Sequence, residues 1–268
     1  MGVTAEHEQL AIGSRVDLVS GTILDPTGIA IAVGSTDQRD PDVAWDGSNW
    51  LVVWQEDRVA GNTGQIYASR VSANGAVIDP GGLPIATGLD QRAHASVAFD
   101  GTNYLVVWER SLVVNHRIEG TRVSTSGVVL DPAGLVISTY GQSRATPAVA
   151  YNGTSYFVTW ANTTRIEGAR LSTAGAVLDS TALVVFEQGV GVKVPRTPDV
   201  ASDGTDFFIV WSVNTAPQRI AGARVTAAFF TRPSSRATRD RSSICIIGRF
   251  RESPMCRSRT SRFPRSKG

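Results

Sequence analysis

The chain has 268 residues, enough to bury a sizeable core, and its hydrophobic content of 42% is that of a soluble globular protein. Its formal net charge of +2 averages two unlike regions, because residues 228–268 hold eleven of the 26 Lys and Arg residues and only two acids. The rest is mildly acidic and lacks the basic face that nucleic-acid binding requires. No apolar run approaches the ~20 residues that span a bilayer, and the N-terminus does not resemble a signal peptide.

The first 38 residues predict part of a structural unit. Residues 14–16 (SRV) and 21–25 (GTILD) match phrases that recur further along the chain as a third and a fourth strand. We therefore expect residues 1–38 to form a partial unit that supplies only these two strands.

The first complete unit, residues 39–91, predicts four strands. Residues 43–45 form a short strand that ends at Asp46-Gly47, a strong hairpin signal. Residues 50–54 (WLVVW) are apolar at every position, which is typical of a strand covered on both faces. Residues 65–72 form a third strand, and residues 76–79 begin a fourth that Pro80 breaks.

This unit then repeats along the chain. The twelve-residue phrase VAWDGSNWLVVW recurs in close variants that begin at Val43, Val97, Val149 and Val200, at intervals of 54, 52 and 51 residues. The expected units are 39–91, 92–143, 144–195 and a truncated 196–227 in which no fourth strand follows. A period near fifty residues indicates an array of one supersecondary unit.

Four antiparallel strands per unit, with the second buried on both faces, predict an all-β, β-propeller-like array of about four to five blades. We expect the tryptophan that ends each second strand to wedge between blades: Trp54, Trp108, Trp160 and Trp211. An immunoglobulin-like sandwich array is the alternative, but its modules need about 100 residues. Either the N-terminal strands complete the last sheet and close a four-bladed ring, or the ring is open and its raw edges favour self-association.

The C-terminal segment, residues 228–268, has two interpretations. It is either a basic arm for an anionic partner or, as we favour, the product of a reading-frame slip, in which case this highly charged segment is expected to be disordered. The change of composition falls in the middle of a unit, which motivates the second interpretation.

The phrases VASDGTDFFIVW and IEGARLS resemble, over about 210 residues, the blade repeats of bacterial secreted and surface proteins. That resemblance implies an extracellular, ligand-binding or adhesive array and implies no reaction. The compartment of this chain stays open.

Candidate ligand-binding residues lie where loops vary between units. An arginine precedes each first strand, and the loops between second and third strands should share its end of the blade. The candidates are Arg39, Arg92, Arg144, Arg196, Glu56, Asp57, Arg58, Glu109 and His116. Arginines there could hold a carboxylate or a sulfated sugar, whereas a purely structural role would have them pin blade to blade.

A second set of arginines recurs within the third strands and is predicted to be structural, bonding turns and neighbouring strands: Arg70, Arg122, Arg170 and Arg224. No catalytic motif occurs, so we expect no catalytic residue and no cofactor. An acidic cluster of Asp37, Asp40 and Asp42 suggests a Ca²⁺ site, but a solvated loop explains it better.

The sequence therefore predicts a non-enzymatic scaffold that binds a carbohydrate, a peptide or a surface polymer. A sialidase-like or other propeller glycoside hydrolase, with its acid pair among Glu56, Asp57 and Glu109, is the alternative. A gene fragment without an independent role is a third hypothesis.

Overall fold

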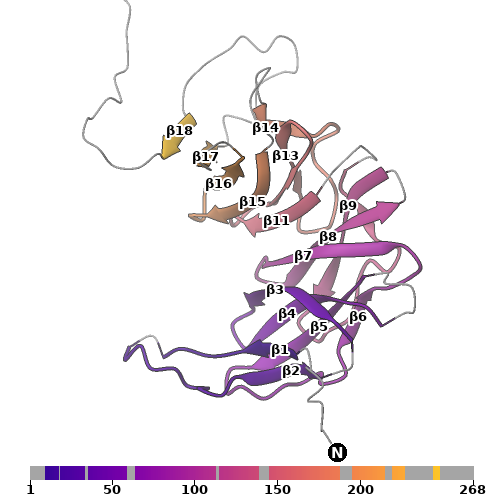
Figure 1. Ribbon diagram of the computed structural model, residues 1–268, viewed down its shortest axis with the longest axis vertical. Helices are drawn as coiled ribbons and strands as arrows, with labels where there is room; N and C mark the ends of the chain where they lie inside the picture. Colours follow the sequence, from indigo (N-terminus) through magenta and orange to yellow (C-terminus); the bar gives the residue numbers. More distant parts are fainter. Residues whose placement is uncertain are drawn as a thin grey trace, which may run out of the picture.

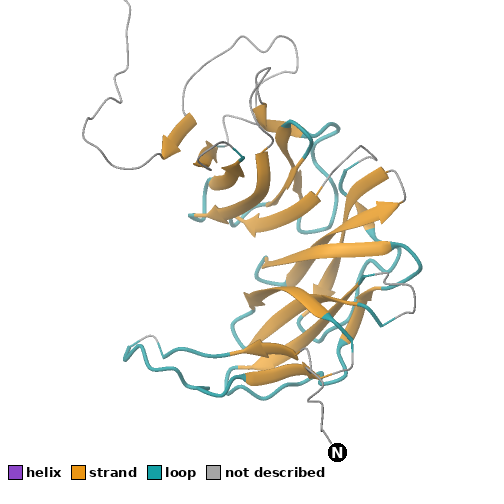
Figure 2. Cartoon of the chain, viewed as in Figure 1, coloured by secondary structure: helices purple, strands orange, loops and turns teal. Residues whose placement is uncertain are grey.

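The computed structural model describes residues 10–17, 19–33, 36–58, 64–112, 115–138, 145–187, 195–214, 219–226 and 244–247. These residues form strands, turns and loops only (Figure 2). Within them, no helix has the length and apolar character that a membrane crossing needs. The predicted all-β, propeller-like fold is confirmed.

Four sheets of four antiparallel strands follow one another along an open arc, preceded by a two-stranded N-terminal sheet (Figure 1). The N-terminal sheet contains β1 (Leu10–Gly13) and β2 (Ile29–Val33). The first sheet contains β3 (Gln38–Trp45), β4 (Asn49–Glu56), β5 (Gln65–Ser72) and β6 (Leu83–Ala86). The second contains β7 (Gln91–Phe99), β8 (Asn103–Leu112), β9 (Asn115–Ser124) and β10 (Leu135–Val136). The third contains β11 (Ala145–Tyr151), β12 (Tyr156–Ala161), β13 (Arg165–Leu171) and β14 (Leu183–Glu187). The fourth contains β15 (Pro195–Ser202), β16 (Phe207–Val213), β17 (Arg219–Val225) and β18 (Ile244–Ile247).

The core is a series of layers, one between each pair of successive sheets. Side chains of β4 alternate between two layers, because Val52 and Trp54 pack against the N-terminal sheet while Leu51 and Val53 pack against the second sheet. This double burial explains why the second strands are apolar throughout. Each repeated tryptophan packs in the layer shared with the preceding sheet and is at most 2% exposed.

The fourth strands lie further along the chain than predicted. Residues 76–79 were expected to begin the strand, but in the first sheet only Val77 forms an isolated bridge, to Val71. The strand β6 starts at Leu83, after a turn in which Gly82 has a φ of 71°. The apolar residues before Asp79 were misleading because they belong to a turn that folds back against the end of β5. The Asp79 carboxylate holds this turn by accepting a hydrogen bond from the backbone N–H of Arg70.

The fourth sheet is complete, contrary to the expectation that its last strand is missing. Residues 244–247 (ICII) pair with β17 from Ile220↔Ile247 to Ala223↔Ile244. The N-terminal strands β1 and β2 pair with each other, and they do not close the ring through this sheet. Residues 244–247 were not predicted as a strand because the surrounding residues of the C-terminal segment are mostly basic and polar. The rest of the C-terminal segment lies outside the described residues.

One end of every sheet gathers the loops of interest. In the first sheet, Gln38 at the start of β3 pairs with Glu56 at the end of β4, which pairs with Gln65 at the start of β5. The same register recurs in the other three sheets. We call this the loop-bearing end, and the first strands β3, β7, β11 and β15 line the inner side of the arc there (Figure 1).

Candidate ligand-binding site

Each first strand is interrupted near the loop-bearing end by a β-bulge. One residue of each bulge has a positive φ although it is not glycine: Asp40 (50°), His94 (53°), Thr146 (50°) and Thr197 (43°). A non-glycine residue in this conformation is strained, most of all a β-branched threonine. Bulges of this kind re-aim side chains and often adjoin functional sites. The inner side of the arc therefore carries four equivalent, re-aimed side chains.

The bulges also change the alignment of the arginines that precede the first strands. Arg39 and Arg196 occupy the position just before the bulged residue, where the second sheet has Ala93. Arg92 lies one residue earlier, so its side chain leaves the opposite face of the sheet. Arg144 lies outside the described residues. The arginines expected to form one ring thus fall into two register positions.

These arginines also differ in their surroundings. Arg39 forms ion pairs with Asp57 at 2.6 Å and with Asp37 at 3.1 Å. Arg196 is exposed, whereas Arg92 is buried between the first and second sheets.

A buried carboxylate in the second sheet forms the centre of a polar cluster. Glu109, at the loop-bearing end of β8, is 6% exposed. His116 Nδ1 lies 2.6 Å from Glu109 Oε1, and His94 Nδ1 lies 3.2 Å from Glu109 Oε2. Ser111 Oγ lies 3.0 Å from the same nitrogen of His116. We call His94, Glu109, Ser111, His116 and Asp40 the histidine–glutamate cluster.

Asp40 brings a carboxylate from the neighbouring sheet to this cluster. Its Oδ2 lies 3.8 Å from His94 Nε2, so the imidazole of His94 stands between two carboxylates. The hydrogen bond with Glu109 raises the pKa of His94 and outweighs the opposing effect of burial. Because Glu109 fixes Nδ1 as a donor, the second proton of His94 binds at Nε2, on the side of Asp40.

The histidine–glutamate cluster breaks the repeat. At the position of Glu109 the other sheets have Gln55, Ala161 and Ser212, and at that of His94 they have Asp40, Thr146 and Thr197. Residues that serve blade packing recur in every unit, whereas a side chain found in one unit only is free to serve a ligand. Glu109 and His116 were predicted as site residues, but His94 was missed.

The other predicted acids are held by arginines. Glu56 is 2% exposed and accepts hydrogen bonds from Trp54 Nε1 at 2.9 Å and Thr36 Oγ1 at 2.7 Å, and it pairs with Arg58. Burial opposes its ionisation, but these partners outweigh it and lower the pKa of Glu56. Arg58 also lies 3.9 Å from the centre of a tyrosine ring. These residues brace the first sheet, and Glu109 is the predicted acid that contacts titratable imidazoles instead.

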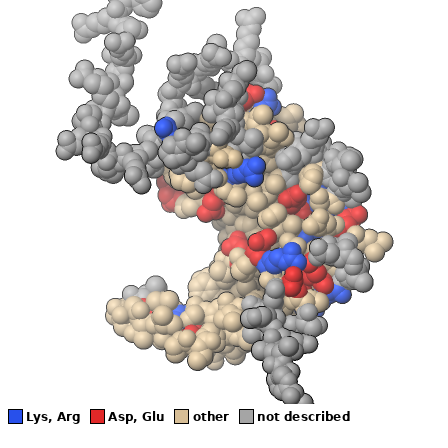
Figure 3. All heavy atoms as spheres, viewed as in Figure 1, with Lys and Arg blue, Asp and Glu red and all other residues tan. Residues whose placement is uncertain are grey.

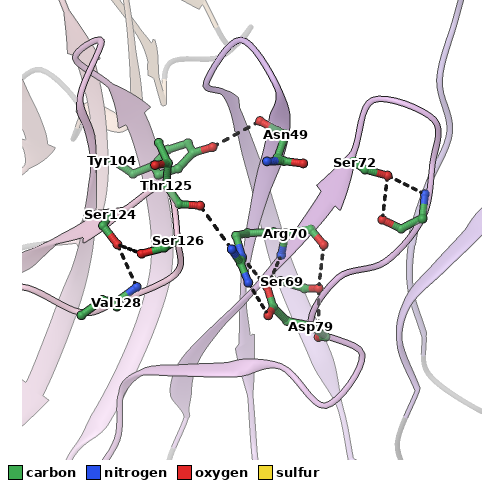
Figure 4. Close-up of polar contacts among 11 residues, drawn as sticks. Asn49, Ser69, Arg70, Ser72, Asp79, Tyr104, Ser124, Thr125, Ser126 and Val128 are labelled. Carbon is green, nitrogen blue, oxygen red and sulfur yellow. Dashed lines mark hydrogen bonds and ion pairs between the residues drawn. The ribbon is translucent and has the colours of Figure 1, made fainter.

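The second arginine set ties the sheets together, as Figure 4 shows for the first and second sheets. Arg70 binds both oxygens of Asp79, at 2.8 and 2.9 Å, and its Nη1 donates to the carbonyl of Thr125 in the second sheet at 3.3 Å. Tyr104 adds a hydrogen bond across the same interface, to the carbonyl of Asn49 at 3.2 Å. The arginine contacts recur in equivalent places: Arg15 with Asp25 and Ala73, Arg122 with Asp131 and Thr173, and Arg170 with Asp179. Arg224 differs, because it pairs instead with Asp206 and Asp203 in its own sheet.

A dense group of charged side chains lies over the first and second sheets in Figure 3, further charged side chains lie over the third and fourth sheets, and the N-terminal sheet shows few. The acids considered for calcium have separate partners: Asp37 pairs with Arg39, Asp40 lies beside His94, and Asp42 accepts hydrogen bonds from the second sheet. Among the described residues, no group of three or more His, Cys, Asp or Glu side chains is placed to hold a metal ion.

Comparisons with known structures agree on the fold. No protein-family model matches the chain, and no curated protein matches it significantly. Among solved structures, a thermostable family-43 glycoside hydrolase aligns with 13% identity and a TM-score of 0.50, over 70% of this chain and 71% of that one. The endo-arabinase from Bacteroides thetaiotaomicron aligns with 16% identity and a TM-score of 0.50, over 69% and 74% of the two chains. At these identities the likeness defines the fold class, that of the β-propellers.

Proposed function

We propose that this protein recognises a carbohydrate at the loop-bearing end of its first two sheets, through the histidine–glutamate cluster. The observation that carries the proposal is the restriction of this cluster to one blade junction of an otherwise repeated scaffold. Its outer members are open to solvent, with Asp40 49%, His94 41% and His116 31% exposed. They stand on strands and on a strained bulge, which hold them in place before a ligand arrives.

The chemistry of the cluster suits sugar hydroxyls. A hydroxyl both donates and accepts, and it can donate to the Asp40 carboxylate while it accepts from a neighbouring imidazole. Glu109 makes no direct contact with such a ligand, because it is buried and both its oxygens hold histidines. Its role is to orient the two rings.

The test is a glycan array followed by calorimetry on the glycans that bind. His94→Ala should weaken binding by roughly tenfold or more, the cost of one charged hydrogen bond. Thr146→Ala, at the equivalent bulge of the third sheet, is the matched control and should bind as the wild type does. No glycan binding by the folded wild type, or equal losses in the two variants, would refute the proposal.

Glycoside hydrolysis is the second candidate. It is favoured by the glycoside hydrolases among the structural neighbours and by the carboxylates of Asp40 and Glu109 on either side of His94. Inverting glycosidases hold their carboxyl groups about 6.5–9.5 Å apart, with a water and the sugar between them. Here the His94 ring occupies that space, so hydrolysis requires the ring to turn away. We favour recognition for this reason.

Reducing-sugar release from arabinan and related polysaccharides separates the two candidates. If the protein hydrolyses glycosides, Asp40→Asn and Glu109→Gln should abolish turnover, while His94→Ala, which vacates the space, should keep or raise it. Glycan binding without release of sugar supports recognition alone.

A further inference from the structure

A pocket of about 280 Å³ opens between the first and second sheets. This is close to the lower end of the roughly 300–1,000 Å³ typical of small-molecule sites. The strand β6 and the turn at 131–134 form its rim, and Arg92, Trp108, Arg110 and Glu119 line its polar part. It lies on the face of the second sheet opposite to Glu109, because neighbouring residues of β8 point to opposite faces. It is therefore separate from the histidine–glutamate cluster.

This pocket contains a buried cation without a counter-ion. Arg92 is 8% exposed, and the guanidinium donates from Nη1 to the backbone carbonyl of Asp90 at 2.9 Å. No carboxylate in the described part of the chain forms an ion pair with it. Burial, and then the charge of Arg110, lowers the pKa of Arg92, as expected for a cation whose charge is poorly compensated.

The nearby acids are already occupied. Arg110 binds the carboxylate of Asp90 through Nε at 3.0 Å and that of Glu119 through Nη1 at 2.9 Å. Arg117 also pairs with Glu119. The third carboxylate at the pocket, that of Asp131, is bound by Arg122. Four guanidinium groups, those of Arg92, Arg110, Arg117 and Arg122, therefore face three carboxylates, and Arg92 is the one without an ion pair among the residues that the structure describes.

A second donor in the pocket also lacks a partner. Trp108 is 2% exposed, and its Nε1 has no acceptor among the described residues. In the first sheet the equivalent Trp54 donates to Glu56 at 2.9 Å. The residue at the Glu56 position in the second sheet is Arg110, so the chain has exchanged an acceptor for a cation.

The fourth sheet shows what the same tryptophan does without these charges. Trp211 Nε1 is also unpartnered, but the residues at the positions of Arg110 and Glu119 there are Val213 and Ala221. The unpartnered indole N–H is therefore not enough to define a site. The combination of that donor, an unpaired guanidinium and an open pocket occurs at the junction of the first and second sheets.

We propose that this pocket binds a small carboxylate of about monosaccharide size, with Arg92 holding the carboxylate oxygens, Arg110 adding its positive charge nearby, and Trp108 Nε1 donating to one of those oxygens or to an adjacent hydroxyl. A guanidinium matches the planar, two-oxygen geometry of a carboxylate, and a desolvated site strengthens the contact. An acidic sugar and a simple organic acid share this chemistry.

Calorimetry on the full chain tests the proposal with D-galacturonate, its methyl ester and acetate. The wild type should bind galacturonate, and the neutral ester should bind at least tenfold more weakly. Acetate binding with the affinity of galacturonate identifies a simple acid as the ligand, and preference for galacturonate identifies an acidic sugar. Either result supports the proposal. Absence of binding by all three probes at millimolar concentration, or equal binding of the acid and its ester, would overturn it.

Two variants assign the contact. Arg92→Met should reduce galacturonate binding on the order of tenfold to a hundredfold. It should also melt at or above the wild-type temperature, because it removes a buried, unpaired charge. Arg165→Met, which removes a partly exposed arginine paired with Glu187 in the third sheet, is the control and should bind as the wild type does. Unchanged binding in Arg92→Met would contradict the assignment.

Discussion

The arginine that links the first sheet to the second offers a direct measure of how the blades hold together. Arg70 makes two hydrogen bonds to Asp79 and one to the carbonyl of Thr125, and its side chain is 18% exposed. Net contributions of hydrogen bonds to charged groups are about 1.5–3 kcal/mol each, but they are not additive and solvent reaches this pair. We therefore expect Arg70→Met to lower the free energy of unfolding by about 2–3 kcal/mol at pH 7.

Arg224→Met is the matched control, because Arg224 occupies the same strand position but is 59% exposed and pairs with Asp206 in its own sheet. A surface ion pair of this kind contributes at most about 1 kcal/mol. Urea unfolding followed by tryptophan fluorescence measures both variants. Equal losses in the two would refute the assignment of the larger effect to the link between sheets.

The same pair gives the prediction a pH dependence. The hydrogen bond from Arg70 lowers the pKa of Asp79 below its ordinary value. A carboxylate with a depressed pKa in the folded state contributes stability that is present above its unfolded pKa, about 3.9, and is lost as pH falls through the folded value. The difference between the wild type and Arg70→Met should therefore shrink below about pH 4. A difference that stays constant from pH 7 to pH 3 would contradict this reasoning.

Three further predictions test other parts of the fold. The pKa of His94 is raised in the folded state, so His94→Gln should destabilise the protein below about pH 6.5. Above the folded pKa of His94 the substitution should have little effect. Urea unfolding at pH 5.5 and at pH 9 measures the difference. Gly101 has a φ of 95° and open space around it, so Gly101→Ala should lower the free energy of unfolding by about 1–2 kcal/mol through backbone strain. Gly81 also has open space but no positive φ, so Gly81→Ala should be neutral or slightly stabilising, and thermal melts compare the two variants. Tyr104→Phe and Tyr156→Phe should each cost about 1 kcal/mol, because each hydroxyl donates to a carbonyl of the preceding sheet, and a double variant should show nearly additive losses by urea unfolding.

Much of the architecture can be predicted from local sequence, because each repeat has the same pattern of apolar strand residues and turn residues. The run at residues 50–54 cannot be half-solvated, since it has no polar face, and this alone predicts sheets stacked on both sides. The position of the fourth strand does not follow in the same way. Val77 and Ile78 look like a strand, yet the hydrogen bonds of Asp79 and the glycine turn that follows place the pairing residues at 83–86. Turn chemistry outweighed apolar pattern there.

The candidate site was predictable only in part, and the bulges are the reason. Counting residues back from each first strand aligned Arg39 with Arg92, but register is defined by pairing, and a one-residue shift reverses the face on which a side chain lies. His94 was missed because a single histidine carries no signal by itself. Aligning the units by their pairing register shows that Glu109 and His94 both depart from the repeat at adjoining positions. That shared departure is the signal by which the pair could have been found.

The second sheet therefore differs from its siblings on both faces at the same end. On one face, the second sheet alone of the four has the His94–Glu109 pair, and on the other, Arg110 stands where the first sheet has the acceptor Glu56. Both faces place a charged side chain at a buried position, Glu109 on one and Arg92 on the other, and burying a charge costs stability. The two candidate sites lie on opposite faces of the second sheet, so a variant of Arg92 should leave glycan binding at His94 unchanged, and a variant of His94 should leave carboxylate binding unchanged.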